Sequence, residues 1–269
     1  MLVGLQAGFG DPIGVDTLKA LRARLVDGVR LDVRGAASEA WVRALIGEAY
    51  SVGLEVLAIA SLREMLWLPA GTAVELENEP DLNGPSATEY AERAREAIQI
   101  AHARGLRLWV GAVSNLNRRG LDYLAAVVGA IPARGVGVTV HRYPHGSDAM
   151  TPHDGFASRD AEVAALRRII GDRPWGVSEF GYHTAPRRRL AWLPWWTTRW
   201  TDAEVGRFVA WEWAFWRRQG ARFAVLYQLN DGPTEAAEDR YGIRTVDGAW
   251  KPSACLFAAG RVDPPGETE

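Results

Sequence analysis

Short apolar runs alternate with longer amphipathic stretches along most of this 269-residue chain. The short runs have the length of buried strands, and the longer stretches have the 3.6-residue period of helices. Strands are predicted at 2–7, 28–33, 54–60, 73–79, 106–113, 136–143, 175–180 and 222–229. Helices are predicted at 16–26, 38–52, 61–67, 86–104, 119–129, 158–170 and 201–219, with a last one near 252–261.

Residues at the predicted helix ends support these boundaries. Ser86 with Glu89, and Thr201 with Glu204, match the capping box, in which side chains bind the free N–H groups of the first turn. Gly105 falls between a predicted helix and a predicted strand, where a left-handed residue usually ends the helix.

Eight strand–helix units in unbroken succession predict an α/β fold, specifically a single-domain (β/α)8 TIM barrel. We assign residues 1–262 to the catalytic barrel, and we expect the Pro-rich, charged tail 263–269 to be frayed. A doubly wound open sheet has the same alternation of elements and is the alternative.

Composition narrows the possible partners. The formal charge of −2 gives no reason to expect a nucleic-acid partner, and no apolar run approaches the roughly 18 residues of a membrane span. Cys255 is the only cysteine, which excludes an internal disulfide. The first residues are predicted to form a strand, so we expect a cytoplasmic protein or one whose leader has been removed. We also expect a monomer.

Polar residues gather where the predicted strands end, and in a TIM barrel these ends form the active face. They are Arg30, Asn78, Glu79, His141, Tyr143, Glu179 and Tyr227. In the fourth strand, the period of two predicts that Glu75, Glu77 and Glu79 share one face. The strand stops before Pro80, which cannot continue a hydrogen-bonded ladder.

Two of these residues, Glu79 and Glu179, end the fourth and seventh strands. A pair of carboxyl groups flanking a cleft is what glycoside cleavage needs, because one must protonate the leaving oxygen while the other stays ionised. Our hypothesis is that Arg30 and Tyr143 stabilise the charged form of Glu179, whereas Glu79 carries the proton.

Three motifs in order strengthen this interpretation: N-E-P at 78–80, H-R-Y-P at 141–144 and E-F-G at 179–181. Together they resemble clan A, the retaining β-glycoside hydrolases built on (β/α)8 barrels. V-E-L-E-N-E-P is similar to the corresponding segment of family 5. H-R-Y-P, W-G-V-S-E-F-G-Y-H-T and Y-G-I-R-T-V-D-G-A-W-K-P-S are more similar to family 39 and its endo-acting bacterial relatives.

The resemblance implies a role for each matching residue. Glu79 would be the general acid/base and Glu179 the nucleophile, while Asn78 would bind the 2-hydroxyl of the sugar. Arg30 and Tyr143 would orient and ionise Glu179.

The resemblance also concerns the sugar-binding subsite next to the cleaved bond. It implies that His141 lines this −1 subsite. Many relatives form the floor of the subsite with a tryptophan on the last strand, but this strand contains none. Tyr227 or a tryptophan from a loop would take its place.

The segment 182–200 after the seventh strand is rich in tryptophan. It contains Trp192, Trp195, Trp196 and Trp200. Because aromatic faces stack on sugar rings, we interpret the four tryptophans of this segment as a substrate platform, with Trp192, Trp195 and Trp196 as substrate-binding residues; a satellite hydrophobic cluster is the alternative. The tryptophans of the following helix, Trp211, Trp213 and Trp216, are predicted to pack against the barrel.

Other chemistries have weaker support. His141 and His145 lie on a strand end and a loop without convergent partners, so no metal site is predicted. Ser178 lacks the G-x-S-x-G setting of a serine hydrolase, and no glycine-rich phosphate loop follows a strand. We therefore expect no cofactor.

The sequence thus predicts a retaining β-glycoside hydrolase, endo-acting on a β-linked polysaccharide or oligosaccharide. Retention requires carboxyl groups about 5–5.5 Å apart. Two alternatives stay open: a carbohydrate-binding barrel without catalysis, and a transglycosylase that uses the same residues.

Overall fold

The computed structural model describes residues 2–6, 14–24, 26–144, 147–185, 187–188, 197–198, 200–234 and 236–257. Trp192, Trp195, Trp196 and the tail 263–269 lie outside these residues.

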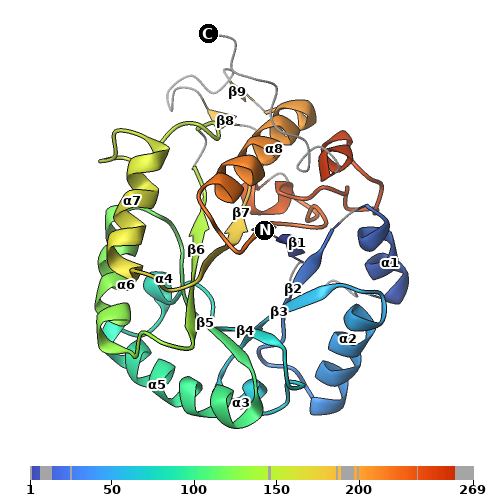
Figure 1. Ribbon diagram of the computed structural model, residues 1–269. Coiled ribbons are helices and arrows are strands. Elements are labelled where there is room, and N and C mark those ends of the chain that lie inside the picture. Colours follow the sequence, from blue (N-terminus) through green and yellow to red (C-terminus); the bar gives the residue numbers. More distant parts are fainter. Residues whose placement is uncertain are drawn as a thin grey trace.

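Eight parallel strands form a closed barrel (Figure 1) in the order β1-β10-β7-β6-β5-β4-β3-β2. The strands are β1 (Leu2–Gln6), β2 (Gly28–Asp32), β3 (Glu55–Ala60), β4 (Ala73–Leu76), β5 (Arg107–Val113), β6 (Val136–Arg142), β7 (Trp175–Phe180) and β10 (Phe223–Leu226). Because β1 pairs with both β2 and β10, the sheet has no free edge. The predicted TIM barrel is confirmed, and the open-sheet alternative is wrong.

Helices surround the barrel (Figure 1). They are α1 (Val15–Ala23), α2 (Glu39–Ser51), α3 (Leu62–Met65), α4 (Pro80–Asn83), α5 (Ala87–Arg104), α6 (Arg118–Ala130), α7 (Arg159–Ile170) and α8 (Asp202–Arg218). Two 3-10 helices, η1 (Ala237–Arg240) and η2 (Pro252–Phe257), and a small antiparallel pair, β8 (Arg187–Arg188) and β9 (Thr197–Thr198), complete the described elements. The helix predicted near 252–261 is therefore a short 3-10 helix.

The predicted helix ends are confirmed. Both capping boxes are formed, so the side chains of Ser86 and Thr201 each accept a hydrogen bond from the third backbone N–H of the helix. Gly105 ends α5 with a left-handed φ of 66°.

The fourth strand is shorter than predicted, ending at Leu76 instead of residue 79. Glu77 and Glu79 adopt left-handed φ values of 60° and 46°, which break the strand alternation. Glu75, which lies within the strand, points into the barrel toward Arg30. Glu77, which lies beyond it, pairs instead with Arg93 of α5. The prediction that the three glutamates share one face is wrong.

The barrel interior has an apolar floor. The rings of Trp109 on β5 and Phe223 on β10 meet edge to face, with centroids 4.8 Å apart. Both rings depend on glycines of neighbouring strands: a Cβ on Gly137 would lie 2.2 Å from Trp109, and one on Gly176 2.6 Å from Phe223. These two rings thus pack against each other at the end of the barrel where the strands begin, beside a pocket of about 400 Å³ that both of them line.

Aromatic residues also fill the layer between strands and helices. Trp213 and Trp216 of α8 are fully buried and Trp211 is partly buried against the same core, as predicted. Trp200 contacts the ring of Phe208 on α8, with centroids 5.0 Å apart, and packs against this core. For Trp200, packing rather than substrate binding is therefore the observed role.

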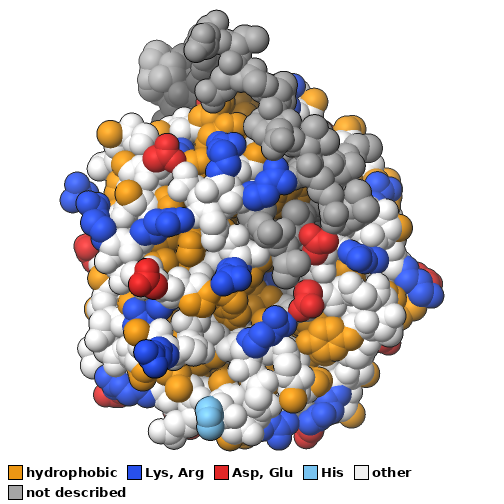
Figure 2. All heavy atoms as spheres, viewed as in Figure 1, with side chains coloured by type: hydrophobic (Ala, Val, Ile, Leu, Met, Phe, Trp, Pro, Cys, Tyr) orange, Lys and Arg blue, Asp and Glu red, His pale blue; other side chains and the backbone are white. Residues whose placement is uncertain are grey.

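Charges of both signs are interspersed over the face that Figure 2 shows, and hydrophobic side chains form separate patches among them. Within the described part of the chain, no helix combines the length and hydropathy needed to cross a membrane.

A buried ionic cluster joins the barrel wall to two helices. Glu212 of α8 accepts hydrogen bonds from Arg142 of β6 at 3.0 Å, from Arg159 of α7 at 2.9 and 3.0 Å, and from the Tyr182 hydroxyl at 2.6 Å. Burial disfavours the ionised carboxyl, but Arg159 and Arg142 outweigh it and lower the pKa of Glu212. The cluster pins α7 and α8 behind β6 and β7.

We expect Glu212→Ala to lower the free energy of unfolding by about 3–5 kcal/mol, because it leaves the buried Arg142 without its carboxylate and leaves the buried Arg159 with Glu162 alone. Since the pKa of Glu212 is lowered, the stabilisation is present above the unfolded-state pKa and disappears as the pH falls through the folded-state value. Urea denaturation at neutral pH measures the loss. The exposed Glu92→Ala is the control, expected to change stability by less than about 0.5 kcal/mol. A loss below about 1 kcal/mol for Glu212→Ala would contradict the expectation.

Candidate active site

Glu179 enters the barrel through an irregularity in β7. The register between β6 and β7 shifts so that Val140 pairs with Val177 and His141 with Glu179, which leaves Ser178 as an extra residue. Such a bulge redirects the next side chain. Glu179 consequently points into the barrel, and its side chain is only 6% exposed.

Arg30 of β2 is the hub beneath the carboxylates. Its fully buried guanidinium donates hydrogen bonds to Glu179, to Glu75 on β4 (Nε–Oε1, 2.9 Å) and to the Asn78 side-chain oxygen at 2.7 Å. Glu75 therefore acts as a counterion that orients Arg30 toward both Glu179 and Asn78.

The end of β6 and the residue after it supply two more contacts. His141 is fully buried, and its Nδ1 lies 3.0 Å from Glu79 and 3.5 Å from Glu179. The Tyr143 hydroxyl donates a 2.5 Å hydrogen bond to Glu179 Oε2, the oxygen that also lies near His141, whereas Arg30 binds Oε1. Because side chains alternate along β6, Arg142 between them points outward to the Glu212 cluster.

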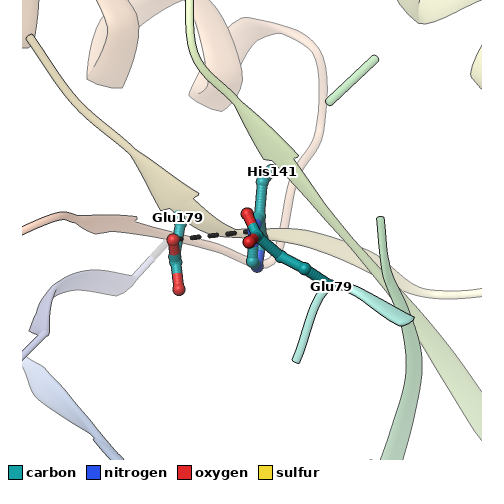
Figure 3. A group of neighbouring side chains, drawn as sticks. All are labelled: Glu79, His141 and Glu179. Carbon is teal, nitrogen blue, oxygen red and sulfur yellow. Dashed lines mark hydrogen bonds and ion pairs between the residues drawn. The ribbon is translucent and has the colours of Figure 1, made fainter. Parts of the chain in front are cut away.

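Glu79 is held at the barrel mouth by its backbone. Its left-handed conformation starts the short helix α4 at Pro80, and its N–H donates to the carbonyl of Ala112 on β5 at 3.1 Å. Its side chain converges with His141 and Glu179 (Figure 3), and an oxygen of each carboxyl group lies within 4.8 Å of the other. In contrast to Glu179, the Glu79 side chain is 25% exposed.

The electrostatics favour an ionised Glu179. Burial alone would raise the pKa of Glu179, but the charges of His141 and Arg30 and the hydrogen bond from Tyr143 lower it. For His141 the signs are reversed. Burial alone would lower the pKa of His141, but the carboxylates of Glu179 and Glu79 raise it.

A cleft of about 500 Å³ opens above these groups. The predicted residues that line it are Asn78, Glu79, Tyr143, Glu179 and Tyr227. Arg30 and His141 are fully buried and are not among the residues that line the cleft.

The cleft extends to both sides of the two glutamates. In the barrel order, β5 and β6 lie between β4 and β7 on one side, and β3, β2, β1 and β10 lie on the other. Arg119 of α6 lines the first side, and Asp32, the last residue of β2, lines the second together with Arg34, which binds the Asp32 carboxylate at 2.6 Å.

An aromatic wall stands on the β10 side of the cleft. The rings of Tyr143, Tyr227 and Tyr241 contact one another with centroids 5.6 to 6.1 Å apart. Tyr241 comes from the loop after β10, and a Cβ on Gly181 would lie 2.8 Å from its ring. Tyr227 is thus joined by a second aromatic ring at the position where relatives were expected to have a tryptophan.

Sequence reasoning missed the roles of Glu75 and Tyr241. The alternation of side chains along β4 is consistent with an inward-pointing Glu75, but its partner Arg30 lies 45 residues away in the sequence. Tyr241 opens the motif Y-G-I-R-T-V, which carried a family resemblance without indicating that its first residue reaches the cleft.

Glu79, His141 and Glu179 are also the described side chains that come close enough together to hold a metal ion. However, Glu179 already has Arg30 as its counterion and Tyr143 as a hydrogen-bond donor. Protein groups therefore already bind both oxygens of Glu179 and balance its charge, and we assign no metal to this group of side chains.

Comparison with known proteins places this geometry in context. Neither a scan against protein-family models nor a sequence search of the curated proteins found a match. Among solved structures, a family 39 glycoside hydrolase from the gut symbiont Bacteroides cellulosilyticus superposes with a TM-score of 0.71 at 15% identity. The alignment covers 97% of this chain and 64% of that one, so the chain spans less than two thirds of this relative.

Two further structures match over nearly the whole of both chains. A β-1,3-glucanosyltransferase of Rhizomucor miehei, in complex with laminaritriose, has a TM-score of 0.68 at 12% identity and covers 94% and 96% of the two chains. Cel5A of Thermotoga maritima, in complex with cellobiose, has a TM-score of 0.64 at 14% identity and covers 96% of each. The chain has the barrel fold of the clan A glycoside hydrolases.

Proposed function

We propose that this protein is a retaining β-glycoside hydrolase, with Glu179 as nucleophile and Glu79 as general acid/base. The observation that carries the proposal is the unequal environment of two carboxyl groups within 4.8 Å of each other. Inverting enzymes need about 6.5–9.5 Å between their carboxyl groups to admit a water, so the short separation favours retention.

The roles follow from burial and contacts. A nucleophile must stay ionised and fixed, and Arg30 and Tyr143 both hold Glu179 in this way. An acid/base must exchange its proton with solvent and reach the leaving oxygen. Glu79 is four times as exposed as Glu179, at 25% against 6%, which suits it to that task.

The reaction has two displacements. In the first, a Glu179 oxygen attacks the anomeric carbon while Glu79 protonates the departing glycosidic oxygen, which leaves a covalent glycosyl-enzyme. In the second, Glu79 takes a proton from water as the water oxygen attacks the same carbon and Glu179 leaves. In this proposal Asn78, whose side-chain oxygen accepts a hydrogen bond from Arg30, binds the 2-hydroxyl, and this contact strengthens as positive charge develops on the sugar.

Endo action on a β-linked polysaccharide is the part of the proposal that rests on the cleft. Its lining continues past the two glutamates to Asp32 on one side and Arg119 on the other, which supports binding of sugar units on both sides of the cleaved bond. The aromatic wall of Tyr227 and Tyr241 offers ring faces for stacking against one of them.

Hydrolysis of a panel of β-linked polysaccharides, followed by NMR of the first-formed product, tests the proposal. Release of internal fragments with β-configured reducing ends is the expected result. Products of inverted configuration would exclude the assigned mechanism, and glycan binding without turnover would favour a carbohydrate-binding barrel. Transfer to an added acceptor sugar in preference to water would indicate a transglycosylase.

A further inference from the structure

The contact between Tyr143 and Glu179 depends on where the Tyr143 backbone lies, because Tyr143 follows the last residue of β6. At this point the β5–β6 ladder has ended, so the peptide groups of Tyr143 need other hydrogen-bond partners. The side chain of Asn115, just beyond the end of β5, supplies them.

Asn115 forms two hydrogen bonds with Tyr143, one in each direction. The Asn115 Nδ2 donates to the Tyr143 carbonyl at 2.8 Å, and the Tyr143 N–H donates to Asn115 Oδ1 at 3.1 Å. The same Oδ1 accepts from the Leu116 N–H at 3.1 Å, which fixes the orientation of the amide. Asn115 is only 2% exposed, so water does not readily replace these bonds.

We propose that Asn115 is a positioning residue that acts through Tyr143 on Glu179, an inference that rests on the proposed function. Its amide links the two chain segments beyond the last β5–β6 pair, Val113 with Val140, and sets the Tyr143 backbone. The phenol then reaches Glu179 at 2.5 Å, where it stabilises the ionised carboxyl. Glu179 is faced by Arg30 of β2, His141 of β6, Tyr143 just after β6 and Glu79 at the start of α4, and Asn115 governs one of these contacts.

His153 is a second support for the same peptide group, since its Nε2 lies 3.1 Å from the Tyr143 carbonyl. Of the Tyr143 peptide groups, His153 contacts only the carbonyl. Among the described residues, the Tyr143 N–H donates its hydrogen bond to Asn115. Loss of the Asn115 amide is therefore expected to release the Tyr143 backbone even with His153 in place.

A double-mutant cycle of Asn115→Ala and Tyr143→Phe tests this dependence. A displacement of about 1 Å in an active site costs roughly 100-fold, so we expect a kcat loss of this order for Asn115→Ala. In the Tyr143→Phe background the same change is expected to cost less than about threefold, because the hydroxyl it positions is gone. Independent, multiplying losses would overturn the proposal.

A measurement without turnover separates this proposal from the proposed function. In wild-type protein, carbon-13 NMR titration of the glutamate carboxyls is expected to show a lowered pKa for Glu179. Both single variants should raise that pKa, and in kinetics both should move the acid limb of kcat/KM to higher pH. An unchanged Glu179 pKa in Asn115→Ala would overturn the positioning role even if no substrate is cleaved.

Controls address folding. Ser158→Ala removes the cap hydrogen bond at the start of α7, far from Tyr143 in the chain, and is expected to leave kcat and the Glu179 pKa unchanged. If Asn115→Ala does not fold, Asn115→Ser makes the smaller change and is expected to show the same raised pKa.

Discussion

Glu179→Gln is expected to lower kcat on an activated aryl β-glycoside by about 10⁴-fold or more, the size of loss seen when hydrolases lose a covalent nucleophile. Glutamine has the same shape, but its amide cannot attack the anomeric carbon as a carboxylate does. Arg30 would keep Glu75 as a counterion, so we expect the fold to survive. Initial rates with wild type and variant at saturating substrate measure the effect.

The nucleophile assignment also makes a covalent prediction. A 2-deoxy-2-fluoro glycoside slows the second displacement, so wild-type protein should gain the mass of one sugar, and peptide mapping should locate it at Glu179. The Glu179→Gln variant should gain none. Glu55→Gln, at the opposite end of the barrel, changes a half-exposed glutamate paired with Arg107 and should behave as wild type. Labelling of any other residue would show that Glu179 is not the nucleophile.

The barrel itself was predictable because its signals are local. Apolar runs and capping boxes such as that of Ser86 depend on neighbours a few residues away, and they located the eight barrel strands and the longer helices to within a few residues, although the short helix α4 was not predicted. The alternation also identified the strand ends, where Glu79 and Glu179 are found. Closure of the barrel was predicted from the number of strand–helix units and did not depend on any single contact.

The predictions that failed depend on contacts between distant segments. The left-handed turn at Glu77 and Glu79 forms where their N–H groups bind Ala60 and Ala112 on the neighbouring strands, which no local pattern in residues 73–81 reveals. Pro80 marked the end of the strand but not the reversal before it. The period of two was therefore extended over residues that do not follow it.

The supporting residues of the site were hidden for the same reason. The role of Glu75 can be recognised only when its partner Arg30 is known. The role of Asn115 likewise depends on Tyr143, whose backbone it binds from 28 residues away. Tyr241 reaches the cleft because Gly181 leaves space for its ring. Sequence reasoning found the groups proposed to react, whereas the groups that hold them required the folded barrel.

Glu79→Gln is expected to reduce activity by roughly 10²–10⁴-fold on a substrate with a poor leaving group, the usual contribution of general acid catalysis. With a leaving group that needs no proton, the first displacement should stay fast and the second should become slow, so the glycosyl-enzyme accumulates. The measurement compares kcat and the burst of released aglycone for the two substrates in wild type and variant.

Addition of azide to the reaction distinguishes a lost general acid/base from a lost nucleophile. As an anion it needs no general base, so on the activated substrate it should restore turnover of Glu79→Gln and yield a β-glycosyl azide, while leaving Glu179→Gln inactive. The alternative proton donor is His141, whose Nδ1 lies 3.0 Å from Glu79. His141 is fully buried, so it can reach a leaving oxygen only through Glu79. A Glu79→Gln variant that keeps near wild-type rates on the poor substrate would contradict this reasoning and assign the proton to another group.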